Sequence, residues 1–270
     1  MNLNPKSDFV YQMFALIISI IIVHTIYVTV IRPRANIQLE AQAARFAAGE
    51  LVDVERSFYI IVHDPEQETC TILALWCLAI IVRKYKNGWD ERKIIKPDLL
   101  EVAPGTSILP EDSRKYSRAL QALPEIERDL LLPRTLLTAL QRFGTTRNIQ
   151  DVSHAIQDIC DSEWNRLDSD LSLIRFCTWV IPAIGFIGTV RGIGNALIQA
   201  QRAVMGDIVG VTVSLGVAFN ATLCALVLAI IINFLLHQLQ QFQERLVLDT
   251  RRYCDVNLIP YLQMRQNDQR

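Results

Sequence analysis

The sequence predicts an all-α membrane protein with about four transmembrane helices and with long helices that extend into a cytoplasmic helical domain. Three observations support this fold class. The 270 residues are 51% hydrophobic and only 20% charged. Their apolar residues gather in four runs, and all but one of these runs can cross roughly 30 Å of hydrocarbon. Basic residues follow the second and fourth runs, as expected of cytoplasmic flanks.

The first apolar run, from Phe9 to Ile31, predicts an N-terminal transmembrane helix within residues 1–31. No small-residue cleavage signature follows it, so an uncleaved helix is favoured over a signal peptide. Residues 32–68 carry seven acids against four arginines, which favours a periplasmic segment. Arg32 and Arg34, directly after the run, argue weakly for the opposite placement.

The second run, residues 69–82, has only 14 residues, a length that is also typical of a buried or re-entrant helix. Trp76 within it and the basic stretch behind it favour a short second transmembrane helix whose ends snorkel to the interfaces. If this run does not span the bilayer, the N-terminus lies outside and residues 32–170 are cytoplasmic.

The remaining chain is expected to form a transmembrane hairpin between two cytoplasmic parts. Residues 83–170 begin with a strongly basic stretch and form a helical domain, in which Asn148 caps a helix that runs into the third span. Residues 171–236 hold the third and fourth runs, joined by a few residues. Residues 237–270 continue the fourth span as a C-terminal helix with one apolar face.

Small residues recur at helical spacing along both arms of this hairpin, and such stripes let helices approach closely. Close packing is the simplest interpretation of the glycines. Two threonines and Asn220 add polar groups that need partners in hydrocarbon. No acid lies at the centre of any run, so either nothing is conducted or a partner supplies a carboxylate.

Two segments of the hairpin, "IPAIGFIGTVRGIGNALIQA" and "AFNATLCALVLAI", resemble the MotA, TolQ and ExbB proton channel family. The resemblance implies a pentamer around two copies of a single-span partner of the ExbD, TolR or MotB kind, whose intramembrane aspartate takes part in ion passage. The family's paired threonines match Thr189 and Thr222, and its proline matches Pro182. Three-span members of the family have no counterpart of the first run.

These considerations assign two sets of residues in the hairpin. The expected lining of the ion path is Thr189, Thr222, Pro182, Gly185, Asn220 and Ala218. The expected helix-packing positions are Gly188, Gly192 and Ala225.

Arg191 is expected to be a structural anchor rather than a pore residue. It lies about 200° around the helix from Thr189, and about 24 Å of helix separate it from Arg175 at the inner boundary. A position near the outer surface allows it to snorkel or to pair with the acidic segment 32–68. Replacement by leucine is expected to weaken assembly and to spare conduction.

The predicted function is that of a multi-pass subunit of an ion-driven motor in the bacterial inner membrane, coupled to protons or to sodium. Two alternatives stay open: a non-conducting membrane scaffold and a flagellar-type stator subunit. The sequence has no nucleophile motif, phosphate loop or metal constellation, and its net charge of −1 shows no basic bias. We therefore expect no enzyme activity, no cofactor or metal and no nucleic-acid partner.

Overall fold

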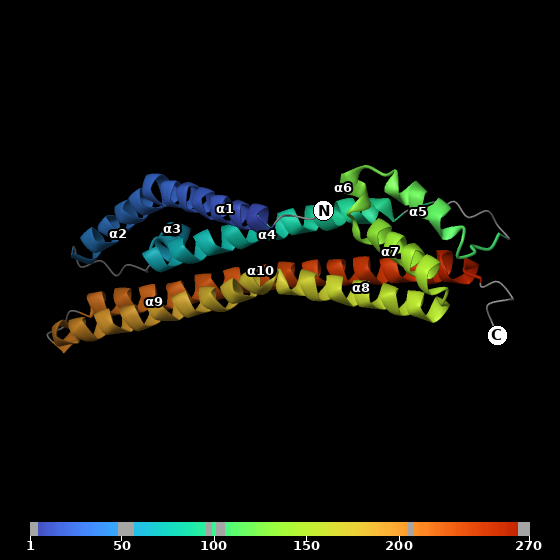
Figure 1. Ribbon diagram of the computed structural model, residues 1–270. Helices are drawn as coiled ribbons and strands as arrows, with labels where there is room; N and C mark the ends of the chain where they lie inside the picture. The colour runs from blue at the N-terminus through green and yellow to red at the C-terminus, as the bar shows by residue number, and fades with distance from the viewer. Residues whose placement is uncertain (1–4, 48–56, 96–98, 101–105, 205–207, 264–270) are drawn as a thin grey trace. The chain divides into compact units, whose positions relative to one another are not determined.

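The computed structural model describes residues 5–47, 57–95, 99–100, 106–204 and 208–263 of the chain. Helices form nearly all of its regular structure, and the only pairing of extended backbone in these residues is an isolated bridge between Ile108 and Leu262. Four helical stretches are long and apolar enough to cross a membrane. The predicted fold class, an all-α protein with about four such helices, is confirmed (Figure 1).

The chain divides into two compact units. We call the first the span unit, which consists of residues 5–81 and 173–236. The second, the helical unit, contains residues 82–172 together with the C-terminal part of the chain from residue 237 onward.

The span unit begins with a helix that is longer than the first apolar run. Helix α1, Pro5–Ile26, continues through a π-helical turn, Tyr27–Ile31, into helix α2, Arg32–Ala47. Pro33 lacks the N–H that an α-helix would offer to the carbonyl four residues earlier. The wide turn lies directly before this proline, and the Arg32 N–H bonds to the Tyr27 carbonyl instead. The basic residues after Ile31 therefore do not end the helix.

Helix α4, Pro65–Ile94, contains the second apolar run and extends it at both ends. A proline at its first position favours a helix start here, because the N–H group that proline lacks would have no partner within the helix. The two acids in the first turn also favour it, because the helix N-terminus carries partial positive charge. The short helix α3, Phe58–Val62, precedes it. Two hydrogen bonds join helix α1 to α4. Trp76 Nε1 donates to the Gln12 carbonyl at 2.8 Å, and Tyr11 Oη donates to the Ala79 carbonyl at 3.3 Å.

The hairpin of the span unit consists of α9, Ser172–Val204, and the first part of α10, Val209–Asn257. Outward-facing side chains on both arms are mostly large and apolar, such as Phe186, Leu197 and Phe219. Such a surface is typical of helices in contact with lipid. The chain is a multi-pass membrane protein.

The helical unit contains α5, Ser113–Gln121, α6, Glu125–Arg128, α7, Leu131–Thr146, and α8, Ile149–Ser169. The predicted cap of α8 is confirmed, since Asn148 Oδ1 accepts a hydrogen bond of 2.9 Å from the Gln150 N–H. The helix does not run unbroken into the third span, because a turn at Asp170 and Leu171 separates α8 from α9.

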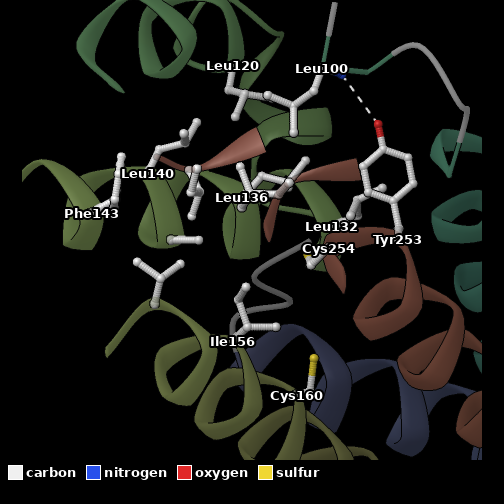
Figure 2. Close-up of a cluster of buried hydrophobic side chains, with 14 of the residues drawn as sticks. Leu100, Leu120, Leu132, Leu136, Leu140, Phe143, Ile156, Cys160, Tyr253 and Cys254 are labelled. Carbon is white, nitrogen blue, oxygen red and sulfur yellow. Dashed lines mark hydrogen bonds between the residues drawn. The ribbon is translucent and has the colours of Figure 1, made fainter. Parts of the chain in front are cut away.

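The core of the helical unit is apolar and draws on α7, α8 and the end of α10. Figure 2 shows Leu136, Leu140 and Phe143 of α7 near Ile156 of α8, and all four side chains are fully buried. Tyr253 of α10 closes one side of the core, and its Oη accepts a hydrogen bond of 3.3 Å from the Leu100 N–H (Figure 2). The cysteines serve as small buried fillers, since all six are free and five are buried.

Candidate functional site

The two arms of the hairpin fit together through their small residues in one register. A Cβ atom added to Gly188 would lie 2.5 Å from Ala221 Cβ, and one added to Gly192 would lie 2.6 Å from Ala218 Cβ. A Cβ atom added to Gly185 would collide with Ala225 in the same way. The expected packing positions therefore lie at the closest approach of α9 to α10, where no larger side chain fits.

Thr189 of α9 and Thr222 of α10 meet within this contact, and their hydroxyl groups hydrogen-bond to each other. Thr222 Oγ1 also lies 3.2 Å from the Gly185 carbonyl. Thr189 Oγ1 lies 3.3 Å from the Gly185 carbonyl and 3.3 Å from the Ala218 carbonyl. Both threonines are partly exposed. The site thus offers two hydroxyl groups with several acceptors and few hydrogens, so each hydrogen can turn from one partner to another.

Pro182 lies in the interior of α9, about two helical turns before Thr189. It has no N–H, so the carbonyl of Thr178 lacks its helical donor and the helix is weakened at this level. Cys70 of α4 packs beside the proline, and its Sγ lies 3.5 Å from the Ile181 carbonyl. Pro182 and Gly185 precede Thr189 on the same arm, and their place in an ion path stays a prediction.

Asn220 does not join the threonine site. It is half-buried and has no hydrogen bond among the described residues. Its position on α10 is about 200° from both Ala218 and Thr222, since two residues advance a helix by two steps of about 100°. Ala218, in contrast, is fully buried at the site and offers its carbonyl to Thr189.

Arg191 pairs with acids from the segment before the second run. Its guanidinium lies 2.8 Å from Glu66 Oε2 and 3.3 Å from Asp64 Oδ1. Glu66 also packs beside the threonine arm, because a Cβ atom on Gly188 would lie 3.3 Å from Glu66 Cγ. The expected pairing of Arg191 with the segment 32–68 thus has a counterpart in the structure, at the start of α4.

A second ion cluster at the same end of α4 was missed by the sequence reasoning. Glu68 is 7% exposed, and its two oxygens lie 2.7 Å from His24 Nδ1 and 2.5 Å from an Arg32 nitrogen. Tyr27 Oη and Thr71 Oγ1 are 3.2 Å apart beside it. These contacts tie α1 and the start of α2 to α4. The sequence did carry a signal for this cluster: His24 and Arg32 are eight residues apart, close to two helical turns, so both can reach the same acid.

Residues 127–252, from α6 to the last turns of α10, match the model of the MotA/TolQ/ExbB proton channel family. Over these residues, slightly less than half of the chain, the protein is similar to the MotA/TolQ/ExbB family. The matched region contains the whole hairpin and the threonine site, and it begins after α1 to α4. No curated protein and no solved structure matches the chain.

The similarity to the MotA/TolQ/ExbB family supports a general role for this chain. The family consists of proton channels and transport proteins rather than enzymes, and its members work in oligomers with single-span partners. The chain therefore has a role in ion conduction or energy transduction. The described residues contain no group of three or more His, Cys, Asp or Glu side chains that could hold a metal ion.

Proposed function

We propose that this protein is the multi-span subunit of an ion-driven motor in the bacterial inner membrane. Five copies surround two copies of a single-span partner that carries an intramembrane aspartate. The observation that supports this proposal most directly is the hydroxyl pair of Thr189 and Thr222, at the closest contact of the two arms. The basic stretch of residues 83–96 supports an orientation with the helical unit in the cytoplasm and the tip of the hairpin outside.

In the proposed mechanism the threonine hydroxyls respond to the charge of the partner's carboxylate. An ionised carboxylate accepts a hydrogen bond that the hydroxyl otherwise gives to the Gly185 or Ala218 carbonyl. When the carboxylate takes up a proton, the hydroxyl returns to the backbone and the partner helix is free to move. One elementary charge that crosses 100 mV releases about 2.3 kcal/mol, so a substantial mechanical step needs several ions.

The ion is proposed to be a proton, with sodium as the alternative. In the described residues, the hydrogen bonds of the threonine site join hydroxyl and carbonyl oxygens, and both kinds of oxygen can serve either ion. We propose no cofactor.

Proton flux into liposomes tests this function, with the subunit reconstituted alone and together with its partner. We expect flux only from the complex, and we expect Thr189→Val or Thr222→Val to reduce it at least about tenfold, because valine keeps the shape and removes the hydroxyl. Thr178→Val and Thr212→Val are matched controls, since within the described residues these hydroxyl groups bond to carbonyls of their own arms. Arg191→Leu is expected to keep the flux and to lower the thermal stability of the complex.

Three outcomes would count against the proposal. An intact complex that conducts neither protons nor sodium would favour a non-conducting scaffold held together by the small-residue stripes. Flux that is indifferent to both threonine substitutions would place the ion path elsewhere. Loss of flux in an assembled Arg191→Leu complex would show that this arginine is part of the path rather than an anchor. A partner with a peptidoglycan-binding domain would identify the complex as a flagellar-type stator.

A further inference from the structure

A polar groove in the helical unit has no part in the proposed ion path. It lies between α5 and the C-terminal end of α7 and has a volume of about 800 Å³. Ser113 and Ser117 are buried and form part of its wall on the α5 side. Gln141 and Thr145 line it from α7. Pockets for small molecules have volumes of about 300–1,000 Å³, so the groove is of the size that a metabolite fills.

Gly144 determines how closely α5 approaches α7 at one end of the groove. A Cβ atom added to this glycine would lie 2.6 Å from Ser113 Oγ. Beyond it, α7 ends in a left-handed residue, Arg147, with φ of 52°. The chain thus turns at the groove, and Arg147 becomes one of its lining residues.

The charge of the groove is strongly unbalanced toward positive. Three arginines line it, Arg114, Arg118 and Arg147, against one acid, Glu111. Within the described part of the chain, neither Arg114 nor Arg118 pairs with a carboxylate. These two residues are four positions apart on one face of α5, where like charges repel and destabilise the helix. An anion between the two guanidinium groups would remove this repulsion.

The hydrogen-bonding groups of the groove also favour an anion. Three hydroxyl groups already donate to backbone carbonyls: Ser113 to Pro110 at 2.7 Å, Ser117 to Ser113 at 2.8 Å and Thr145 to Gln141 at 2.9 Å. The donors that remain for a ligand include the guanidinium groups of Arg114 and Arg118 and the side-chain amides of Gln121 and Gln141. Guanidinium stays charged at every physiological pH, and its planar fork matches the oxygens of phosphate.

We propose that this groove binds a small molecule that carries two linked phosphate groups, of the size of a nucleoside diphosphate. Arg114 and Arg118 hold the phosphates from one face of α5. Arg147 contributes a third positive charge from the end of α7. The inference does not depend on ion conduction, since it concerns only the helical unit and is tested without the partner protein.

Binding to the full-length oligomer in detergent tests the proposal, with isothermal titration calorimetry as the measurement. The probes are ADP, pyrophosphate, inorganic phosphate and a glutamate-rich peptide. We expect ADP and pyrophosphate to bind more tightly than inorganic phosphate. The double variant Arg114→Gln/Arg118→Gln is expected to lower their affinity at least about tenfold, because two charged hydrogen-bond donors are lost. Lys115→Gln is the matched control, since this exposed cation is on the same helix and does not line the groove.

Several results would overturn the proposal. These are the absence of binding by either diphosphate probe, an unchanged affinity in the double variant, and an equal loss in Lys115→Gln, which would indicate only general attraction by positive charge. Tighter binding of the peptide than of both diphosphates would identify the groove as a docking surface for an acidic protein segment instead. Circular dichroism of each variant shows whether the helical unit is still folded.

Discussion

Glu163 illustrates how single charged residues are accommodated in this chain. Only 5% of its side chain is exposed, and its oxygens bond to Arg166 and, at 2.8 Å, to Arg134. Burial by itself opposes ionisation of this carboxyl. The hydrogen bonds and positive charge of Arg166, followed by those of Arg134, outweigh burial and lower the pKa of Glu163 below its usual value. The same carboxyl raises the pKa of Arg166.

The lowered pKa of Glu163 predicts a dependence of stability on pH. In the unfolded chain this carboxyl takes up a proton near pH 4.5, and in the folded chain it does so only at lower pH. Its contribution to the free energy of unfolding is therefore present above pH 4.5 and is lost as the pH falls through the folded pKa. Glu163→Gln should lower the free energy of unfolding by about 1–2 kcal/mol at pH 7, because charged hydrogen bonds are lost while the two arginines, which are nearly half exposed, stay in contact with water.

Urea unfolding of the full-length protein in detergent, followed by circular dichroism between pH 7 and pH 3, provides the measurement. The difference between the wild type and Glu163→Gln should shrink as the pH falls in the acid range. Asp161→Asn, an exposed change on the same helix, is the control and should leave the unfolding curves within about 0.5 kcal/mol. A constant difference at every pH would show that Glu163 acts through packing alone.

At the scale of the elements, the hairpin is held by the close approach of two helices that carry small residues in register. Gly188 lies against Ala221, Gly192 lies against Ala218, and the hydroxyl pair is at the same level. Hydrocarbon supplies no hydrophobic drive for helices to associate, so packing contacts and hydrogen bonds must hold the two arms together.

A pair of glycines one half-turn apart on α9 tests this packing. In Gly192→Ala the new Cβ atom would lie 2.6–2.9 Å from the Cβ, Cα and N atoms of Ala218, and backbone atoms cannot move aside cheaply. We expect a destabilisation of about 1–3 kcal/mol, the usual cost of overpacking. Gly194→Ala is the control, because nothing lies within 4 Å of its added Cβ atom. Thermal unfolding in detergent measures both, and equal melting temperatures for the two variants would contradict the packing argument.

At the scale of the whole molecule, the chain combines a family hairpin with segments that the family model does not match. Residues 127–252 match the MotA/TolQ/ExbB family, whereas α1 to α4 precede the match. Glu68 and Arg191 bind these preceding helices to one another and to the hairpin through ion pairs. Apolar contacts alone would not specify which helices associate, because the surrounding lipid is equally apolar, whereas ion pairs specify the partners.

The proposed orientation predicts which parts of the molecule a water-soluble thiol reagent reaches. A cysteine at Lys115 in the helical unit should react only after the inner membrane is opened, because this unit is proposed to be cytoplasmic. A cysteine at Gln201, near the tip of the hairpin, should react in intact spheroplasts. The parent protein is the control, since five of its six cysteines are buried. The reverse pattern of labelling would invert the proposed topology.

Much of the fold was predictable because its signals are local. The length of the apolar runs, the cap at Asn148 and the spacing of the small residues each depend on neighbours within a few turns. The predicted ends of the helices agreed less well with the structure. The π-helical turn before Pro33 let α1 continue into α2, and the acids at the start of α4 became part of the helix.

The sequence by itself determined the membrane class, the hairpin and the stripes of small residues, since hydrophobic length and helical period are properties of the chain alone. Only the tertiary structure decided which polar groups meet. In the structure Thr189 contacts Thr222, and Arg191 pairs with Asp64 and Glu66. Glu68 is bound by His24 and Arg32, whereas Asn220 lies away from the threonine site. These partners are 33 to 127 residues apart in the chain. Their pairing depends on the rotation and register of packed helices, which no local pattern specifies.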